Sequence, residues 1–575
     1  MRFFRGMCLS VLVVSLSVLS SRAAEPGDMP KLIELDSKEI SAYVVVPHLD
    51  TFIKDMEGLG NKFSPFPMKP GTMKTQIGAG IGDPELAGFD FSKPLVIMVL
   101  KGPPALPPLP AAPPPVIVFI PVKNAEPYKN AMTLIMKAQV DVKDNVVISS
   151  DTPESLEKGV AQKAAYDKIA AAELKGDMRV FASIEKLTET YGRQIDGALD
   201  QASKTFAMLQ ANPAAAPGVD MKSLGLIMKV YMKAIAAALK QSQSVQMDLT
   251  VKDDSVAQDL LFAAKPASTL AKLMVEPSPG ENAFLPLIKP GGILSIAGRF
   301  NPAAMKDVAD ALMPEIEKDP ELKEVLDEKM TGMIKDAVPL LGGEMAMSML
   351  PSDKGFAQTR SVMTITDAKK YTDLLDRMVT LIGPDSTLGK LYANMGITMQ
   401  FAKNTREHAG VSIHAMKFVL DEKKIQPAQV AQMKLMMHDT ELAVFKNVYL
   451  TSTVPAELDA MIDQVQSGAI PKADAPPLKA MATFGPKQQL YADYDLLSVM
   501  KATIGADPVN PMAALFKDMK GGEPIQIAGA MKDGSVVLHT VVPLEPIIQM
   551  AKTVQQLNGP GIKPPPPPPD KPGQF

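Results

Sequence analysis

The feature that most constrains the fold of this chain is an internal repeat. Residues 245–256 read VQMDLTVKDDSV and residues 525–536 read IQIAGAMKDGSV, and the same offset aligns Pro266 with Pro546 and Ala271-Lys272 with Ala551-Lys552. In both segments alternating apolar residues predict a strand, a polar turn leads into a second apolar strand, and a proline precedes an amphipathic helix. The repeat therefore predicts a β-hairpin followed by a helix at two places.

Four further pairs of segments correspond in the same order along the chain. They are residues 42–59 with 293–312, 116–135 with 360–379, 145–160 with 447–465, and 179–192 with 490–505; the second pair aligns Tyr128 with Tyr371. An ordered series favours duplication of one folding unit, and the alternative is one large mixed domain with accidental similarities. We predict a first copy at residues 24–276 and a second copy at residues 284–556.

Each copy is expected to be an α+β unit, a mostly antiparallel sheet with helices packed on one face. The other face is left open by the sequence: it could meet the partner copy, further helices or a cavity. The first copy carries helical residues 155–175 and a helical insertion at 196–243, where Leu224, Ile227, Met228, Tyr231, Ile235 and Leu239 have three- and four-residue spacings. The second copy adds a strand pair near 397–420 and a helix near 427–437.

The first residues predict export. Arg2 and Arg5 begin the chain, residues 7–19 are mostly apolar, and Ser21-Arg22-Ala23 has small residues at the two positions that a signal peptidase reads. The apolar stretch is shorter than the roughly 20 residues of a spanning helix, so a permanent anchor is the weaker interpretation. We predict a signal peptide at residues 1–23 and an exported protein, periplasmic or at the cell surface, with no stable membrane span.

Removal of this peptide changes what chemistry the chain can perform. It takes away the only cysteine, Cys8, which lacks the setting of a lipidation site, so disulfides, thiol nucleophiles and cysteine–zinc sites are excluded from the mature chain. Three arginines leave with it, and the formal net charge changes from −4 to −7. A nucleic-acid partner would need a basic face, so none is expected.

Two segments are rich in proline. Residues 101–115 separate two apolar strands, LVIMVL and VIVFI, and are expected to form an extended hairpin loop in polyproline conformation. The tail at residues 557–575 is expected to be extended and disordered. Either segment could bind a partner through a PxxP motif, although a stiff solvated spacer needs no partner.

Candidate sites are few. GAGIG at Gly78–Gly82 has Asp83 where a dinucleotide motif needs its third glycine, which favours a flexible turn. Among the histidines, which are His48, His408, His414, His438 and His539, the pair His408 and His414 with Glu407 is close enough in sequence to suggest zinc, but the stretch alternates like an exposed strand. His539 is expected at an outward or half-buried place. Its counterpart in the first copy is Asp259, so we expect an ordinary polar site.

Methionine clusters and acid pairs suggest no chemistry beyond packing. Met433, Met436, Met437 and His438 have helical spacing, whereas Met345, Met347 and Met349 alternate as on one face of a strand; both could bind Cu(I), but core packing is the better interpretation. Asp493 and Asp495 lie on one face of a strand, which suffices neither for a glycosidase nor for a metal site. No serine stands in a known catalytic motif. We therefore assign no catalytic, metal or cofactor residue and no cofactor.

The chain resembles a broad set of uncharacterised exported bacterial proteins with duplicated α+β repeats. The resemblance rests on GFDFSKPLVIMVLKG, on the strand–proline–helix units around NVVISSDTPESL and NVYLTSTVPAEL, and on the closing KDxSV hairpins. It covers most of the mature chain and implies export and this fold. It implies no activity and no site residues.

The expected function is therefore binding without catalysis. We expect an exported protein that holds a hydrophobic small molecule or an extended peptide in the groove between its two copies, because a duplication creates a concave junction that methionines could line. The alternatives are an envelope scaffold that contacts proteins through sheet edges and proline segments, and a hydrolase of unfamiliar type.

Overall fold

The computed structural model describes residues 33, 35 and 38–557, apart from 65–66, 103–112, 135–136, 211–231, 233–234, 278–281, 318–327, 353–356, 384–385, 395, 426–429, 431–432, 435–436, 469–477, 506–518 and 520. The predicted signal peptide, the tail beyond residue 557, most of the proline-rich loop, and Leu224 to Tyr231 of the helical insertion lie outside these residues. In the described part, no helix is both long and apolar enough to cross a membrane.

Within the described residues the fold is mixed α and β, built on one antiparallel sheet of 18 strands. We call β1–β8 the first half of the sheet and β9–β18 the second half. The first half runs in the order β4 (Gln139–Lys143), β5 (Val146–Ser150), β3 (Val116–Pro121), β2 (Leu95–Leu100), β1 (Ile40–Val46), β6 (Met178–Ala182), β7 (Ser242–Val251) and β8 (Ser255–Ala264).

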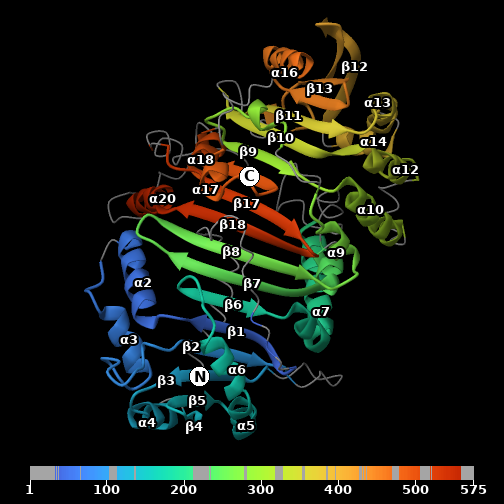
Figure 1. Cartoon of the computed structure of the whole chain (residues 1–575). Helices are drawn as coiled ribbons and strands as arrows, with labels where there is room; N and C mark the ends of the chain where they lie inside the picture. The colour runs from blue at the N-terminus through green and yellow to red at the C-terminus, as the bar shows by residue number, and fades with distance from the viewer. Residues whose placement is uncertain are drawn as a thin grey trace, which may run out of the picture.

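The second half continues the sheet beyond β8. Its order is β18 (Ser535–Pro543), β17 (Ile525–Lys532), β16 (Leu490–Tyr494), β9 (Leu294–Arg299), β10 (Leu341–Pro351), β11 (Ala357–Ile365), β15 (Val448–Ser452), β14 (Thr440–Phe445), β13 (Val411–Leu420) and β12 (Ile397–His408). In Figure 1 the strands follow one another from β4 at the bottom to β12 at the top.

The two halves are joined by the antiparallel pairing of β8 with β18, which we call the seam. Its register runs from Ser255 opposite Pro543 to Ala263 opposite Ser535. Both strands belong to the hairpins predicted from the repeat: β7–β8 turns at residues 252–254, and β17–β18 turns at Asp533 and Gly534, whose φ angles of 51° and 77° suit a tight turn. The predicted helices follow as α9 (Thr269–Leu273) and α20 (Leu544–Leu557).

Helices cover both faces of the sheet, so the prediction of helices on one face only is wrong. In the first half, α2 (Leu49–Phe63), α3 (Thr72–Gly80) and α4 (Glu126–Leu134) pack on the side of Val44 and Ile97, which we call the α2 face. Helices α5 (Pro153–Ala161) and α6 (Lys163–Ala170) pack on the side of Val45 and Met98, the α6 face. All seven residues of β1 are buried, and a strand that is apolar on both sides needs a cover on each.

The second half is covered in the same way. Helix α13 (Ala368–Ile382) packs on the α2 face, over Met363 and Tyr449, while α16 (Pro455–Ser467) and α17 (Lys479–Phe484) pack on the α6 face, over Ala346 and Leu450. The remaining elements are α7 (Ile184–Gln210), α10 (Pro302–Glu317), α12 (Glu328–Ala337), α14 (Thr387–Asn394), α18 (Leu496–Gly505) and the short 3₁₀ helices η1 (Leu285–Leu287) and η2 (Val338–Leu340).

Two helix pairs connect the halves beyond the seam. Met56, Leu59 and Phe63 of α2 pack with Leu544 and Ile548 of α20 over β7 and β8. Helix α10, which follows β9, packs against α9, which follows β8. Figure 1 shows α2 and α20 at one end of the central strands and α9 and α10 at the other. Each pair contains one helix from each half, so each half depends on the other for part of its cover.

Candidate functional site

A single row of directly opposed residues crosses all 18 strands on the α6 face. It starts at Asp141 on the edge strand β4 and ends at Arg406 on the edge strand β12. Between these ends most members are buried and apolar or aromatic: Ile148, Phe119, Val96, Val45, Ala528, Tyr491, Ala297, Ala346, Val362, Leu450, Ala443 and Ile413. The exceptions are four consecutive members at the seam, Arg179, Asp248, Asp259 and His539. We call these four residues the charged row.

The charged row consists of two hydrogen-bonded pairs. Arg179 on β6 donates from Nε and Nη2 to the two oxygens of Asp248 on β7, at 2.5 and 2.6 Å. His539 on β18 donates from Nδ1 to Oδ1 of Asp259 on β8, at 2.7 Å, and its ring stacks on Phe484 of α17. None of the four is more than 8% exposed. Burying charges is unfavourable unless they are paired in this way.

The two carboxylates face each other across β7 and β8, so the order of groups along the row is cation, anion, anion, histidine. Burial raises the pKa of Asp248; the bidentate Arg179 opposes that shift, and the charge of Asp259 adds to it. Burial also raises the pKa of Tyr43, which lies beside this pair and stacks on Phe181 at 4.9 Å. The hydroxyl of Tyr43 has no hydrogen-bond partner within the described protein.

This arrangement is suited to fixing register rather than to catalysis. A nucleophile needs an adjacent base, and the one base in the row, His539, is engaged with Asp259 and covered by Phe484. A one-residue slip of β8 against β18 would break the second pair, because it would place Leu260 or Gln258 opposite His539 and turn Asp259 to the other face. The pair therefore favours the observed register of the seam.

The α2 face of the same central strands is different in character. Leu260 and Leu538 lie opposite each other across the seam. Leu249 on β7 and Ile527 on β17 are diagonal to them, opposite Gln258 and Thr540, and all four leucine and isoleucine side chains are half-buried. The surface continues over β9 and β10 with half-buried Ile296, Met345 and Met347. We call these seven apolar residues the apolar floor. It lies on the same face as α2 and α20, and its first-half members Leu249 and Leu260 pack against the edge of the core under α2.

The predicted acid pair, Asp493 and Asp495, lines one cavity but caps two helices. Asp493 accepts hydrogen bonds from the backbone N–H groups of Lys479 and Ala480 at the start of α17, at 2.8 and 2.9 Å. Asp495 accepts from the backbone and hydroxyl of Ser498 at the start of α18, at 3.0 and 2.6 Å. Both carboxylates line a cavity of about 240 Å³. Burial raises the pKa of Asp493, although its backbone donors oppose the shift.

The histidines suggested for zinc do not converge. Glu407 and His408 are neighbours on β12 and so point to opposite faces, and His408 pairs with Asp463 of α16 at 2.8 Å. His414 is buried, stacks on Phe401 and accepts the backbone N–H of Asn404 at 3.1 Å; burial lowers its pKa. Within the described residues, no three acidic, histidine or cysteine side chains are grouped to hold a metal ion.

The other histidines and the methionines occupy ordinary structural positions. His48 precedes α2 without capping it, and Nε2 of His438 is buried without a partner in the described part of the chain. Met345, Met347 and Met349 lie on one face of β10, as expected from their alternation. Met436 of the other cluster lies outside the described residues.

The expectation for the glycine-rich segment needs correction. Gly78 and Gly80 are the last turn of helix α3 rather than a flexible turn, and only Gly82 lies in the turn that follows. A Cβ on Gly78 would lie 2.2 Å from the carbonyl oxygen of Asp83, and one on Gly82 would lie 2.0 Å from Cβ of Ala131. These glycines are required for close packing, and the segment contains no phosphate-binding turn between strand and helix.

Sequence reasoning found two members of the charged row and missed the others. It paired Asp259 and His539 as counterparts of the repeat, but expected His539 to be outward or half-buried, whereas 3% of it is exposed. Arg179 and Asp248 were not predicted as a pair, because residues 69 positions apart carry no local signal of pairing. A charged residue at an inward position of each strand was the available signal: Arg179 stands between Met178 and Val180, and Asp248 between Met247 and Leu249.

The comparisons with known proteins give no relative: no family model matches the chain, and neither a curated protein nor a solved structure matches it.

Proposed function

We propose that the chain contains one folding unit twice and that the two copies meet at the seam. The strand order β4-β5-β3-β2-β1-β6-β7-β8 has a counterpart in β14-β15-β11-β10-β9-β16-β17-β18. The aligned Tyr128 and Tyr371 are both buried, on helices α4 and α13. The opposed seam residues Asp259 and His539 differ by 280 positions, the offset of the repeat. These three agreements support the duplication.

We further propose that the protein is exported and binds an apolar small molecule, without catalysis, on the apolar floor at the junction of its halves. The observation that carries this proposal is the half-buried state of Leu260 and Leu538, two large aliphatic side chains facing each other at the centre of an 18-stranded sheet. Apolar surface left in contact with water is unfavourable, and contiguous apolar patches mark places where something binds.

The backbone around the floor favours a small molecule over an extended peptide. Strands β7, β8, β18 and β17 are each paired on both sides, so their N–H and C=O groups are engaged and cannot accept a peptide as an additional strand. A ligand without hydrogen-bonding groups, such as a lipid chain, loses nothing by lying there. The methionines Met345 and Met347 add flexible side chains that can adjust to different shapes.

The seam also indicates how such a ligand would be held. Binding proteins that close a cleft need few contacts across their hinge. Here the halves share a continuous hydrogen-bonded ladder and two helix pairs, α2–α20 and α9–α10, which resist a hinge motion. The proposed site is therefore preformed, and affinity depends on apolar area rather than on closure.

The test uses the mature chain, purified gently, and a fluorescent dye that brightens in apolar surroundings. Leu260→Thr and Leu538→Thr introduce a β-branched residue that suits a strand but make the floor polar, so each should lower dye binding several-fold. The matched control is Val419→Thr on β13, which changes a 45% exposed side chain away from the floor and should leave dye binding unchanged. Native mass spectrometry of the same preparation should detect a retained lipid-like molecule.

Two outcomes would contradict the proposal. One is equal dye binding by the floor variants and by Val419→Thr, since the dye would then bind elsewhere. The other is a purified wild-type chain that carries no apolar molecule and takes up none from added lipid.

A second candidate function, envelope scaffolding, is favoured by one specific observation. The edge strand β12 is paired only with β13 within the described sheet, so its outer edge presents unpaired backbone groups to another chain. The irregular register between Ala402 and Arg406 bends its second part and leaves Ile397–Ala402 as the regular edge. Thr398→Pro should abolish recovery of envelope proteins in pull-downs if that edge is used, and an unchanged set of partners would count against scaffolding.

A further inference from the structure

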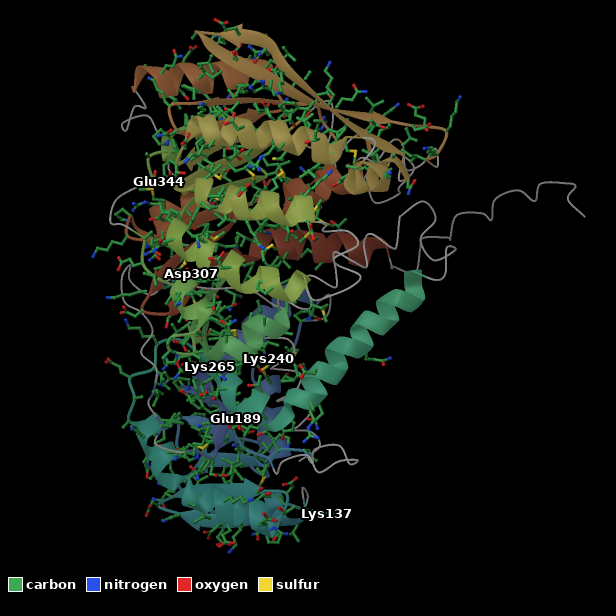
Figure 2. All side chains as sticks on the ribbon, turned by 90° about the vertical axis from the view of Figure 1, so that its right-hand side faces the viewer. Lys137, Glu189, Lys240, Lys265, Asp307 and Glu344 are labelled. Atoms are coloured by element: carbon green, nitrogen blue, oxygen red, sulfur yellow. The ribbon has the colours of Figure 1, made fainter. Side chains whose placement is uncertain are left out.

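The cavity that Asp493 and Asp495 line combines acidic and aliphatic side chains. It has a volume of about 240 Å³ and lies on the α6 face, where β16 ends beside the start of β9, under the loop of residues 288–292. In Figure 2 the second half of the sheet, which contains Glu344, lies above the first half, which contains Glu189 and from which α7 projects. All residues that line the cavity belong to the second half, and the apolar floor lies on the other face of the same strands.

Three side chains with oxygen atoms come together at this cavity. Asp493 on β16 lies directly opposite Ser295 on β9, so the two side chains are neighbours on one face of the sheet. Asp495 follows just beyond the end of β16, and its backbone N–H donates to the carbonyl oxygen of Ile293 at 2.8 Å. This bond holds Asp495 beside the start of β9, and all three side chains belong to the cavity wall.

The hydroxyl of Ser295 is an unused hydrogen-bonding group. Ser295 is 3% exposed, and its hydroxyl makes no hydrogen bond within the described protein. Unlike the hydroxyls of Ser41 and Tyr43, it is not closed off from accessible surface. A Cβ on Gly292 would lie 2.6 Å from its oxygen, so the glycine, which also lines the cavity, leaves the hydroxyl uncovered. A buried hydroxyl without a partner is unfavourable, so a ligand that supplies the partner is favoured.

The two carboxylates have hydrogen-bond donors but no cation. Each of their four oxygens accepts one bond in capping α17 or α18, and a carboxylate has about four acceptor positions, so each can accept further bonds. Neither carboxylate forms a salt bridge within the described part of the chain.

The lysines of the wall do not neutralise these carboxylates. Lys479 pairs with Glu523, and Lys289 pairs with Glu457. Burial raises the pKa of Asp493; its backbone donors and Lys479 oppose the rise, while Glu523 adds to it. The charges of the wall that lack an opposite charge are therefore negative, and a cation would offset the cost of burying them.

We propose that this cavity binds a small primary alkylamine in its ammonium form. An ammonium group has three N–H donors, which match the oxygens of Asp493, Asp495 and Ser295. The aliphatic part contacts Ile288 and Leu478, which are buried and line the same cavity. An anion is disfavoured by the two carboxylates. A metal ion is disfavoured because, among the described residues, no third acidic or histidine side chain joins them.

The test is calorimetric titration of the mature chain with n-butylamine at neutral pH, where the amine is charged. The matched neutral ligand is 1-butanol, tetramethylammonium supplies the charge without N–H donors, and calcium represents a metal ion. We expect binding of butylamine alone. The proposal does not depend on the apolar floor, so Leu538→Thr should bind butylamine as wild type does.

Two variants of the cavity and one matched control assign the binding. Asp495→Asn keeps a good N-cap residue for α18 but removes the charge, so it should weaken butylamine binding at least tenfold. Ser295→Ala removes one hydrogen bond and should weaken binding about fivefold. The control Asp367→Asn makes the same change at the N-cap of α13, away from the cavity, and should leave the affinity unchanged.

Thermal unfolding separates a binding role of Asp495 from a structural one. Butylamine should raise the midpoint of wild type and of Asp367→Asn, but not that of Asp495→Asn. The proposal is overturned by absence of butylamine binding at millimolar concentration, by equal binding of butanol or tetramethylammonium, or by tighter binding of calcium. Unchanged affinity in Asp495→Asn or in Ser295→Ala would overturn it as well. Loss of dye binding at the apolar floor would bear only on the first proposal.

Discussion

His539 and Asp259 form a hydrogen bond of 2.7 Å between the two strands that join the halves of the sheet. Under the proposed duplication these residues occupy the same position of the repeat, so at this point each copy meets its counterpart in the other copy. If the two copies had identical sequences, the same residue would stand on both strands at this point, giving two carboxylates or two imidazoles. Because one copy has Asp259 and the other His539, the contact between the first half and the second half is favourable.

The first prediction concerns this contact. His539→Leu leaves the carboxylate of Asp259 buried without its partner and should lower the free energy of unfolding by about 3–5 kcal/mol. The exchange variant, Asp259→His with His539→Asp, restores the pair in reverse and should recover more than half of the loss. Denaturant unfolding at neutral pH measures both. An exchange variant no more stable than His539→Leu would show that the contact itself contributes little.

The second prediction concerns Arg179 and Asp248. Arg179→Leu alone should destabilise by about 3–5 kcal/mol, because it leaves a buried carboxylate unpaired. Arg179→Leu combined with Asp248→Leu should lie within about 1 kcal/mol of wild type, since an apolar pair of similar size avoids the desolvation of both charges. The row itself offers the precedent: on the other side of the seam it continues with Ala528 and Tyr491. Additive losses in the double variant would refute this account.

The course of the sheet could be predicted from sequence only where signals are local. The hairpins β7–β8 and β17–β18, the strand pair β12–β13 and the helices after Thr152 and Val454 follow from alternation, turn residues and prolines. The seam could not be predicted in this way, because its opposed residues Asp259 and His539 are 280 positions apart and the pairing of β8 with β18 depends on which edges remain free after each half has folded. The cover on both faces was missed for a related reason: β1 is apolar on both sides, but no local pattern shows which helices return to it.

The candidate site could likewise be predicted only where its signals are local. Asp493 and Asp495 were predicted to share one face of a strand, but β16 ends at Tyr494, between them. Their roles as caps depend on α17 and α18 lying at its end.

The third prediction is a pH dependence caused by Asp493. Burial raises the pKa of its carboxyl group above the unfolded value of about 4. The folded chain therefore holds this proton at a pH where the unfolded chain has released it. This contribution to stability is fully present below the unfolded pKa and is lost as the pH rises through the folded one. Asp493→Asn should flatten the fall in unfolding free energy between those two values, as measured by urea unfolding at a series of pH values. An unchanged slope would contradict it.

The fourth prediction concerns the glycines of residues 78–82. Gly82→Ala should destabilise by about 2–4 kcal/mol, because φ is 84° and the new methyl group would overlap Ala131. Gly80→Ala is the matched control: nothing lies within 4 Å of its added Cβ, and alanine favours the helix by about 1 kcal/mol. Thermal unfolding should lower the midpoint for the first variant and not for the second. Equal midpoints would show that the turn can relax around a side chain.

The helix pairs α2–α20 and α9–α10 make the covalent link between the halves dispensable for their cohesion. Cleavage of the chain between Met274 and Asn282 would give two fragments, each retaining a helix docked on the other and a strand hydrogen-bonded along the seam. The nicked molecule would migrate as one particle on a sizing column and melt in a single transition. A proteolytic cut at this link would thus leave the particle whole.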